Sequence, residues 1–275
     1  MFEGMLEDRI AVVTGASAGI GEAVATAIVA AGGKVVVNAR RQDRLRTLAD
    51  RLGGPAVSVA VPGDAADPEV IRSILDTARQ RLGAGIRDAD LVVVNAGRGL
   101  RGSVYNSDES QWEEVIRLNF TAAARLMRAA AERMAGTVPM VQGPPKDGPA
   151  PTPPEGWLSR PRDIIVLGST VGRHVSPFSS MYGATKSAVH MLAESLRRNL
   201  APRGVRVSLI EPGIVRSEFQ EVAGYDPASF GQFMDSIAPV LDPEHIARTI
   251  VFMASQPAGV HINDVMIRPT RQEYP

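Results

Sequence analysis

The chain has 275 residues, enough for one large α/β domain, and 44% of them are hydrophobic, which suffices for a sizeable core. Thirty basic residues balance thirty acidic ones without any basic tract, so the composition favours neither a nucleic-acid partner nor an anionic membrane surface. The absence of cysteine excludes disulfides, thiolate catalysis and cysteine metal sites, and no apolar stretch approaches the roughly 20 residues of a membrane span.

Short β-branched runs alternate with amphipathic segments along the chain. The predicted strands are Arg9–Thr14, Lys34–Ala39, Val57–Val61, Asp90–Asn95, Asp163–Gly168, Val205–Ile210 and Asp264–Ile267. The predicted helices are Gly19–Ala31, Asp43–Leu52, Pro68–Leu82, Gln111–Met134, Tyr182–Ala201 and Asp242–Ser255. Because the strands are apolar on both faces, the pattern predicts a Rossmann-type doubly wound α/β fold. It would form a single domain over 1–275, with a parallel sheet of about seven strands and helices on both faces.

The first predicted strand ends in a glycine-rich turn, Gly15-Ala-Ser-Ala-Gly19-Ile-Gly21. Glycine lets the backbone bend sharply and approach a pyrophosphate, and the N-terminus of the following helix favours negative charge. The turn therefore predicts a dinucleotide site, although such a turn can also serve helix–strand packing alone.

The second strand leads into Arg40 and Arg41, without the acid that NAD-binding proteins usually place there for the ribose 2′-hydroxyl. A carboxylate would repel a 2′-phosphate, whereas arginine offers a planar, permanently charged group that binds it. We therefore expect NADP(H) rather than NAD(H), with Arg40 as the principal contact and Arg41 as the second. The alternative is that both arginines only solvate the start of the next helix.

Residues 136–163 interrupt the alternation of strands and helices and hold eight of the 20 prolines. Proline fits neither a helix interior nor a central strand, so we expect a proline-rich surface insertion, extended in part. The segment is either an insertion without a function of its own or a region that binds a partner.

A candidate acid–base group follows the fifth strand. Tyr182 and Lys186 are four residues apart and share a helix face, and Ser169 lies thirteen positions before Tyr182. We expect Lys186 and a positively charged nicotinamide to lower the pKa of Tyr182 from about 10 toward neutrality, and Ser169 to hold a substrate oxygen toward Tyr182. A Tyr/Lys pair alone is common on solvated helix faces, and a serine after a strand is usually a turn residue, so the joint pattern carries this prediction.

Ligands of parallel sheets bind at the carboxyl ends of the strands. The candidate residues fall at these ends, namely Gly15, Asp64, Asn95, Ser169 and Pro212-Gly213. Their convergence supports one composite site.

Together these motifs resemble the short-chain dehydrogenase/reductase family. The resemblance rests on Thr14–Gly21, Asn95-Ala-Gly97, Tyr182-Gly-Ala-Thr-Lys186 and Glu211-Pro-Gly213, and it covers nearly the whole chain outside 136–163. It implies an oxidoreductase that interconverts a ketone or aldehyde and an alcohol, with Tyr182 as general acid and base. The C-terminal stretch from Ile262 to Gln272 also resembles a subgroup with 3-hydroxy-acid and serine dehydrogenases and secondary-metabolite reductases.

The resemblance assigns roles to further residues. The implied catalytic tetrad is Asn119, Ser169, Tyr182 and Lys186, in which the Asn119 backbone carbonyl holds a water that links to Lys186. The expected cofactor contacts are Gly15, Ser17, Ala18, Gly19, Ile20, Gly21, Arg40, Arg41, Asp64, Ala65, Asn95, Ala96, Gly97, Tyr182, Lys186, Pro212, Gly213, Ile214 and Ser217. Within this set the Asp64 carboxylate would accept a hydrogen bond from the adenine amino group, and Asn95 would steady the sheet. Ile214 would contact the nicotinamide carboxamide through its main chain. Gly168 departs from the family pattern, because a pair of serines is common at 168 and 169.

The stretch over about 214–240, with its glycines and phenylalanines, is expected to form a substrate lid. Asp67 is expected to cap the helix that follows it. His174 could contact the substrate or face solvent. His190, His245 and His261 lack metal-ligand spacing, so we expect no metal.

The expected partner is a small carbonyl or alcohol substrate, with neither nucleic acid nor membrane. The helices over 111–134 and 182–201 carry more apolar surface than one sheet face needs, and equivalent helices pair across a two-fold axis in the family. We therefore expect a homodimer or homotetramer. The N-terminal residues 1–9 contain three acids and lack the apolar stretch of a signal peptide, so a cytoplasmic protein is expected.

Two alternative functions remain open from the sequence. A non-catalytic NADP(H)-binding sensor or scaffold would be expected to lose members of the tetrad, all of which are present. A nucleotide-sugar epimerase of the extended branch usually carries a TGxxGxxG turn and a longer C-terminal domain.

Overall fold

The computed structural model describes residues 3–136, 160–174 and 176–273. Within these residues seven strands form one sheet in the order β3-β2-β1-β4-β5-β6-β7, and each neighbouring pair is parallel. The strands are β1 (Ile10–Thr14), β2 (Lys34–Ala39), β3 (Ser58–Pro62), β4 (Leu91–Val94), β5 (Asp163–Leu167), β6 (Arg206–Pro212) and β7 (Asp264–Ile267). The strand order reverses between β1 and β4, which is where doubly wound sheets bind their ligands. The predicted fold class is confirmed.

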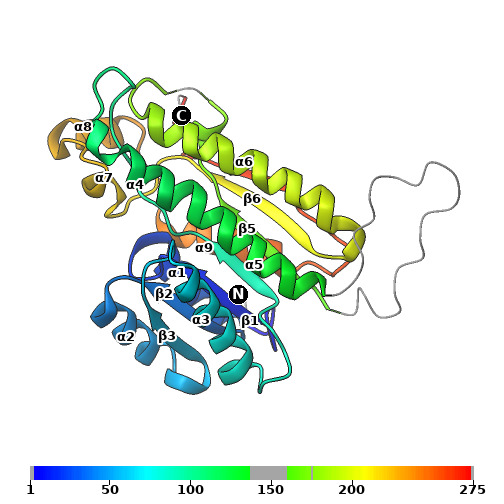
Figure 1. Cartoon of the computed structure of the whole chain (residues 1–275). Coiled ribbons are helices and arrows are strands. Elements are labelled where there is room, and N and C mark those ends of the chain that lie inside the picture. The colour runs from blue at the N-terminus through cyan, green and yellow to red at the C-terminus, as the bar shows by residue number, and fades with distance from the viewer. Residues whose placement is uncertain (1–2, 137–159, 175, 274–275) are drawn as a thin grey trace, which may run out of the picture.

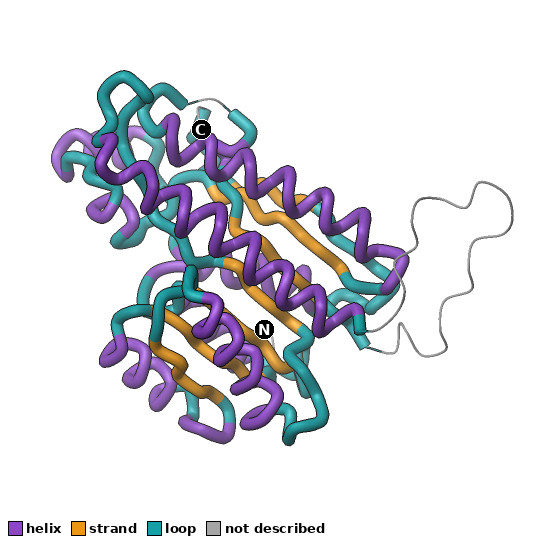
Figure 2. The backbone as a smooth tube through the Cα atoms, in the orientation of Figure 1, coloured by secondary structure: helices purple, strands orange, loops and turns teal. Residues whose placement is uncertain are grey.

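Helices cover both faces of the sheet (Figure 1, Figure 2). One layer consists of α1 (Gly19–Ala30), α2 (Gln42–Arg51) and α9 (Pro243–Ala254). The other consists of α3 (Pro68–Thr77), α5 (Ala123–Ala135) and α6 (Ser180–Leu200). At the carboxyl ends of the strands lie α4 (Trp112–Ile116), α7 (Phe219–Val222) and α8 (Pro227–Ser236).

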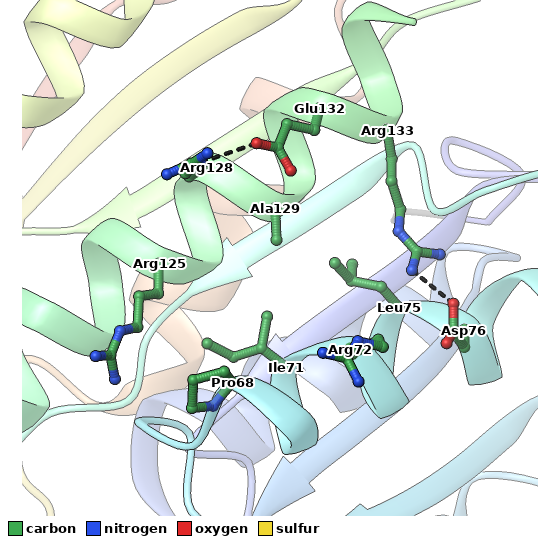
Figure 3. A pocket seen from close by; sticks show the side chains of 10 residues that line it. All are labelled: Pro68, Ile71, Arg72, Leu75, Asp76, Arg125, Arg128, Ala129, Glu132 and Arg133. Carbon is green, nitrogen blue, oxygen red and sulfur yellow. Dashed lines mark hydrogen bonds and ion pairs between the residues drawn. The ribbon is translucent and has the colours of Figure 1, made fainter.

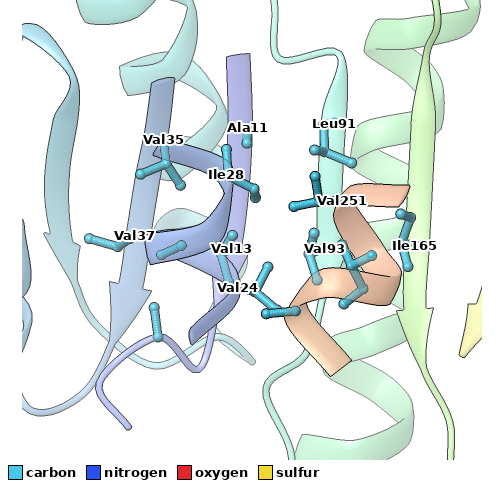
Figure 4. Packing of buried hydrophobic residues seen from close by; sticks show 14 of the residues in the cluster. Ala11, Val13, Val24, Ile28, Val35, Val37, Leu91, Val93, Ile165 and Val251 are labelled. Atoms are coloured by element: carbon cyan, nitrogen blue, oxygen red, sulfur yellow. The ribbon is translucent and has the colours of Figure 1, made fainter. Parts of the chain in front are cut away.

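The core is formed by strand residues that alternate between the two layers. Val13 packs with Val24 of α1 and Val251 of α9 (Figure 4), whereas its neighbour Val12 packs in the opposite layer, and all four are fully buried. The alternation follows from the two-residue repeat of a strand. It explains why these strands carry apolar residues on both faces, which is the pattern that predicted them.

The helix expected over Gln111–Met134 is divided. A π-helical segment, Arg117–Ala122, joins α4 to α5. A wider turn of this kind shifts the hydrogen-bond ladder by one residue. As a result Leu118 packs against Ala66 near the strand ends, whereas Leu126 packs against the sheet. The helix expected over Pro68–Leu82 likewise ends as α3 at Thr77, with a π-helical segment after it.

A buried ion-pair network joins the opposite, amino-terminal ends of the strands. Arg9 pairs with Asp90 and with Asp163, in each case at 2.7 Å, and Arg206 pairs with Asp163 at 2.6 Å. These four side chains are almost fully buried, so each charge depends on its partners. The network lies at the end of the sheet that faces away from the candidate residues.

A groove of about 430 Å³ lies between α3 and α5 (Figure 3). Four of its charged residues pair with one another, in the 2.9 Å contact between Arg128 and Glu132 and the 2.5 Å contact between Arg133 and Asp76. It lies between the helices of one layer and not at the strand ends, and we assign it no function.

The expected surface insertion and the expected lack of a membrane span can be compared with the structure only for the described residues. The proline-rich insertion at 136–163 falls mostly outside the described residues, and the chain re-enters the sheet at Asp163. In the described ranges no helix is both long and apolar enough to cross a bilayer.

Candidate active site

The glycine turn after β1 forms a close-fitting backbone cradle. Gly15 and Gly19 have φ angles of +68° and +55°, which side-chain-bearing residues rarely adopt. A Cβ on Gly21 would overlap the Gly15 carbonyl oxygen and lie 2.6 Å from Asn95 Nδ2. α1 begins at Gly19 behind Ala18, without a side-chain cap, so its first N–H groups can bind an anion. This cradle, which spans the predicted contacts from Gly15 to Gly21, fits a pyrophosphate.

Asn95 ties the carboxyl ends of β1 and β4 together. Its Nδ2 donates to the Thr14 carbonyl at 2.8 Å, and the backbone N–H groups of Asn95 and Ala96 each donate to Thr14 Oγ1 at 3.2 Å. Gly97 continues this segment toward Asn119 and Lys186. The supporting role expected for Asn95 agrees with these contacts.

The two arginines after β2 occupy different places. Arg41 Nε donates to Ser17 Oγ in the glycine turn at 3.0 Å, and Arg41 Nη1 pairs with Glu218 at 2.7 Å. The Arg40 side chain is 68% exposed, and its nearest acid is Glu114 at 3.9 Å. Arg41 therefore lies against the cradle, whereas the ranking of the two arginines as contacts of a 2′-phosphate stays a prediction.

Asp64 is already bonded within the protein. Its carboxylate accepts a hydrogen bond from the Ala66 N–H at 2.9 Å and pairs with Arg117 at 2.7 Å. A contact with an adenine amino group would share this carboxylate with Arg117. Asp67 caps α3 as predicted, accepting from the Glu69 N–H at 2.8 Å.

Asn119 lies in the π-helical segment and is almost fully buried. Its side-chain amide accepts from the Arg98 N–H and donates to the Arg98 carbonyl, both at 2.8 Å, and also donates to Thr185 Oγ1 at 3.1 Å. The amide thus joins the loop after β4 to the residue beside Lys186. π-Helical turns occur frequently at functional sites, and this one places Asn119 against Thr185, the residue that precedes Lys186.

Ser169, Tyr182 and Lys186 meet where β5 ends and α6 begins. Lys186 is buried, donates to the Leu167 carbonyl at 2.6 Å, and lies 5.8 Å from the centre of the Tyr182 ring. The Ser169 hydroxyl accepts a hydrogen bond from the Val171 N–H at 3.4 Å. The tetrad predicted from sequence is therefore gathered in one place.

The protein groups by themselves shift the pKa of Tyr182 upward, whereas the expected lowering also includes a positively charged nicotinamide. Burial raises the pKa of Tyr182 to about 12, against a smaller lowering by the hydrogen bond with Ser169. Burial also lowers the pKa of Lys186 to about 8. Loss of water disfavours the charged form of each group, and here this effect exceeds the effect of their proximity.

The two ends of the predicted lid segment, 214–240, lie next to each other. The Arg216 N–H donates to the Leu241 carbonyl at 2.8 Å, so both ends of the segment lie side by side. At the start of α7 the Phe219 ring stands edge-on to Tyr182, with 5.3 Å between ring centres. Ser217 lies against Gly19 of the cradle. The segment therefore borders both the cradle and Tyr182.

The Pro212-Gly213 turn at the end of β6 is held by the C-terminal segment. The buried Gln272 side chain accepts a hydrogen bond from the Ile214 N–H at 2.9 Å, and the Ile214 carbonyl accepts from the Leu241 N–H at 3.2 Å. Both main-chain groups of Ile214 thus have protein partners, and the carboxamide contact expected for this residue stays a prediction.

The histidines have separate surroundings. His174 is exposed, and His190 lies behind Ser169, whose N–H donates to its Nε2 at 3.3 Å. No group of three potential metal ligands gathers among residues that the structure describes. His190 and Gln272 are the residues near the site that the sequence interpretation missed. The sequence signal that could have indicated His190 was the glycine at 168, where the family commonly has serine.

Comparisons with known proteins agree with this geometry. A family model described as short chain dehydrogenase matches residues 9–140 and 159–227. An uncharacterized oxidoreductase of Staphylococcus aureus (strain N315) is 31% identical over 265 residues, which are 96% of this chain and 99% of that protein.

Solved structures show the same architecture. The closed form of a serine dehydrogenase complexed with NADP+ is 29% identical, with a TM-score of 0.76 over 96% of both chains. A short-chain type dehydrogenase/reductase from Mycobacterium marinum is 25% identical, with a TM-score of 0.78 over 99% of this chain and 98% of the other.

Proposed function

Because this chain belongs to the short-chain dehydrogenase family, we propose that it is an NADP(H)-dependent oxidoreductase that interconverts a ketone or aldehyde and an alcohol. One observation carries the proposal, namely that Ser169, Tyr182 and Lys186 meet beside the glycine cradle at the carboxyl ends of the strands. A hydride carrier and a proton donor would therefore reach the same substrate carbonyl group.

The cofactor site is proposed from the residues that fit it. The cradle from Gly15 to Gly21 would hold the pyrophosphate, and Arg41, bonded to Ser17, would bind the 2′-phosphate. The related serine dehydrogenase, complexed with NADP+, supports the choice of NADP(H) over NAD(H). When bound, the nicotinamide would supply or accept the hydride.

The protein residues would manage the proton. In the reducing direction Tyr182 donates its proton to the substrate oxygen, and the high pKa of the buried phenol keeps that proton in place before reaction. Ser169 holds the oxygen by a hydrogen bond. Lys186, fixed by the Leu167 carbonyl, stabilises the phenolate as it forms. Asn119 positions this group through Thr185.

The test is turnover of NADPH against a panel of carbonyl compounds. Removing the acid in Tyr182→Phe should lower kcat by about 100- to 10,000-fold. The matched control is Tyr105→Phe, because Tyr105 is 97% exposed and makes no contact with the tetrad, and it should retain full activity. Unchanged turnover in Tyr182→Phe would remove Tyr182 from this role. Tight NADPH binding with no turnover across the panel would favour the sensor or scaffold alternative.

The substrate class and the assembly are proposed at a coarser level. The serine dehydrogenase relative supports a second panel of 3-hydroxy acids assayed in the oxidising direction with NADP+. Ketones of secondary metabolism belong in the carbonyl panel. A homodimer or homotetramer is proposed, since Met191 on α6 is 73% exposed and would be covered by a second copy. Light scattering at micromolar concentration that gave only the mass of one chain, 29.3 kDa, would contradict this assembly.

A further inference from the structure

A buried charged cluster lies behind Ser169, and the proposed chemistry does not use it. Glu211, the penultimate residue of β6, has no exposed surface. Arg173 Nε donates to its Oε2 at 2.9 Å, and Arg173 Nη2 contacts the other oxygen. His190 Nδ1 lies 3.8 Å from the same Oε2. A fully buried carboxylate is unfavourable unless it is paired, so this arrangement has a cost that a purely apolar packing would avoid.

The imidazole of His190 connects this cluster to the tetrad. Its Nε2 accepts the hydrogen bond from the Ser169 N–H at 3.3 Å. A neutral imidazole that accepts at Nε2 carries its proton on Nδ1, and here that proton faces Glu211. The cluster therefore favours one tautomer and one ring orientation.

The surroundings of His190 keep it neutral. Burial, Lys186 and Arg173 lower the pKa of His190 to about 4, and Asp264 opposes them. Glu211 is the other charged group that faces the ring. Only the neutral ring can accept the Ser169 N–H, because a protonated imidazole has donors at both nitrogens.

Two glycines beside Ser169 make room for this ring. A Cβ on Gly168 would overlap His190 Nε2. A Cβ on Gly172 would lie 2.5 Å from His190 Cε1, and its three nearest atoms would all belong to the imidazole. The glycine at 168, where the family commonly has a serine, is thus explained by the histidine.

We propose that His190, oriented by Glu211, is a positioning residue that sets the backbone of Ser169 and so directs the Ser169 hydroxyl toward Tyr182. This inference rests on the proposed function, because the direction of that hydroxyl matters only if it holds a substrate oxygen. The contact of His190 with the proposed tetrad is the hydrogen bond from the Ser169 N–H, so it would act through Ser169.

The first experiment compares two replacements of similar size. His190→Leu removes the acceptor and should lower kcat by about 3- to 10-fold, the range expected for one hydrogen bond, with KM for NADPH unchanged. His190→Gln keeps an acceptor near the position of Nε2 and should recover most of kcat. His261→Leu is the control, since His261 is a half-buried histidine that contacts Val207 and Ser208 instead of the tetrad, and its kcat should not change.

The second experiment uses Gly172. Gly172→Ala should lower kcat because the new methyl group displaces the imidazole. In a His190→Ala background the same change should have no further effect, because the clashing ring is gone. Additive losses, or equal kcat values for His190→Leu and His190→Gln, would overturn the inference while leaving the proposed function intact.

The third experiment needs no turnover. Nitrogen-15 NMR of the four histidines in the cofactor-free protein should show one imidazole in the Nδ1–H form that stays neutral to about pH 4, and His190→Gln should remove that signal. An Nε2–H tautomer for His190, or its protonation near pH 6.5, would refute the arrangement directly. If the parent reduced no carbonyl compound, the proposed function would fail, and the role for Ser169 would fail with it.

Discussion

Replacing Arg41 tests which of two adjacent arginines would bind the 2′-phosphate. The Arg41 guanidinium contacts Ser17 of the cradle at 3.0 Å, and its side chain is 45% exposed. Its present ion pair with Glu218 is a surface pair worth about 0–1 kcal/mol, whereas a charge-assisted hydrogen bond to phosphate contributes about 1.5–3 kcal/mol. The phosphate should therefore displace Glu218 from Arg41.

Arg41→Ala should weaken NADPH binding by about 10- to 150-fold, which is this free energy expressed as a ratio of dissociation constants. NADH affinity should change little, because NADH lacks the phosphate. Arg40→Ala is the matched control, and we expect a change below about threefold, since the Arg40 side chain is 68% exposed and 3.9 Å from its nearest acid.

The assay is calorimetric titration of each variant with NADPH and with NADH in the absence of substrate. Glu218→Gln adds a test of opposite sign, because it removes a carboxylate that competes with the phosphate for Arg41 and should strengthen NADPH binding. Glu221→Gln, an exposed acid on the same lid segment, serves as its control. A larger loss in Arg40→Ala than in Arg41→Ala, or equal weakening of NADPH and NADH, would refute the reasoning.

Three further predictions concern pH and stability. The pKa of Lys186 is lowered to about 8 while Tyr182 stays protonated to about 12, so kcat for carbonyl reduction should fall as pH rises through about 8, and a pH–rate profile that stays flat to pH 10 would contradict this. The folded-state pKa of His190, about 4, lies below its ordinary 6.5. The contribution of neutral His190 to the free energy of unfolding is therefore fully present above pH 6.5. About 3 kcal/mol of it is lost as the pH falls to about 4. Urea titrations of the parent should show this loss, and those of His190→Gln should lack it. Asp163→Asn leaves Arg9 without one of its two partners and should lower the free energy of unfolding by about 3–5 kcal/mol, with an unchanged NADPH dissociation constant measured on the folded fraction.

The order of strands and helices could be predicted from the chain because it depends on local pattern. Strands buried on both faces are rich in apolar residues at successive positions, as in Leu91–Val94, and helices need an apolar stripe. The glycine turn could be predicted because Gly15 and Gly19 require positive φ angles. The Tyr182–Lys186 spacing places both residues on one helical face whatever surrounds the helix.

Other features depend on contacts between residues that are distant in sequence. Arg40 and Arg41 are adjacent, and only the packing of β2 beside β1 decides that Arg41 reaches Ser17. The contact of His190 with Ser169 and that of Gln272 with Ile214 span 21 and 58 positions. The periodicity of a single helix or strand does not predict contacts over such separations.

The protonation of the site also required the tertiary structure. From sequence, Lys186 and a positively charged nicotinamide are expected to lower the pKa of Tyr182, whereas burial within the protein raises it. The balance between desolvation and charge depends on how much water and which groups surround the phenol. The sequence by itself determined the fold and the position of the glycine turn, and it predicted the tetrad from residue types and spacing, because these depend on local periodicity and residue type. The tertiary structure alone decided which arginine meets the cradle, what holds Ser169 and which charges are favoured, because those depend on distances across the folded chain.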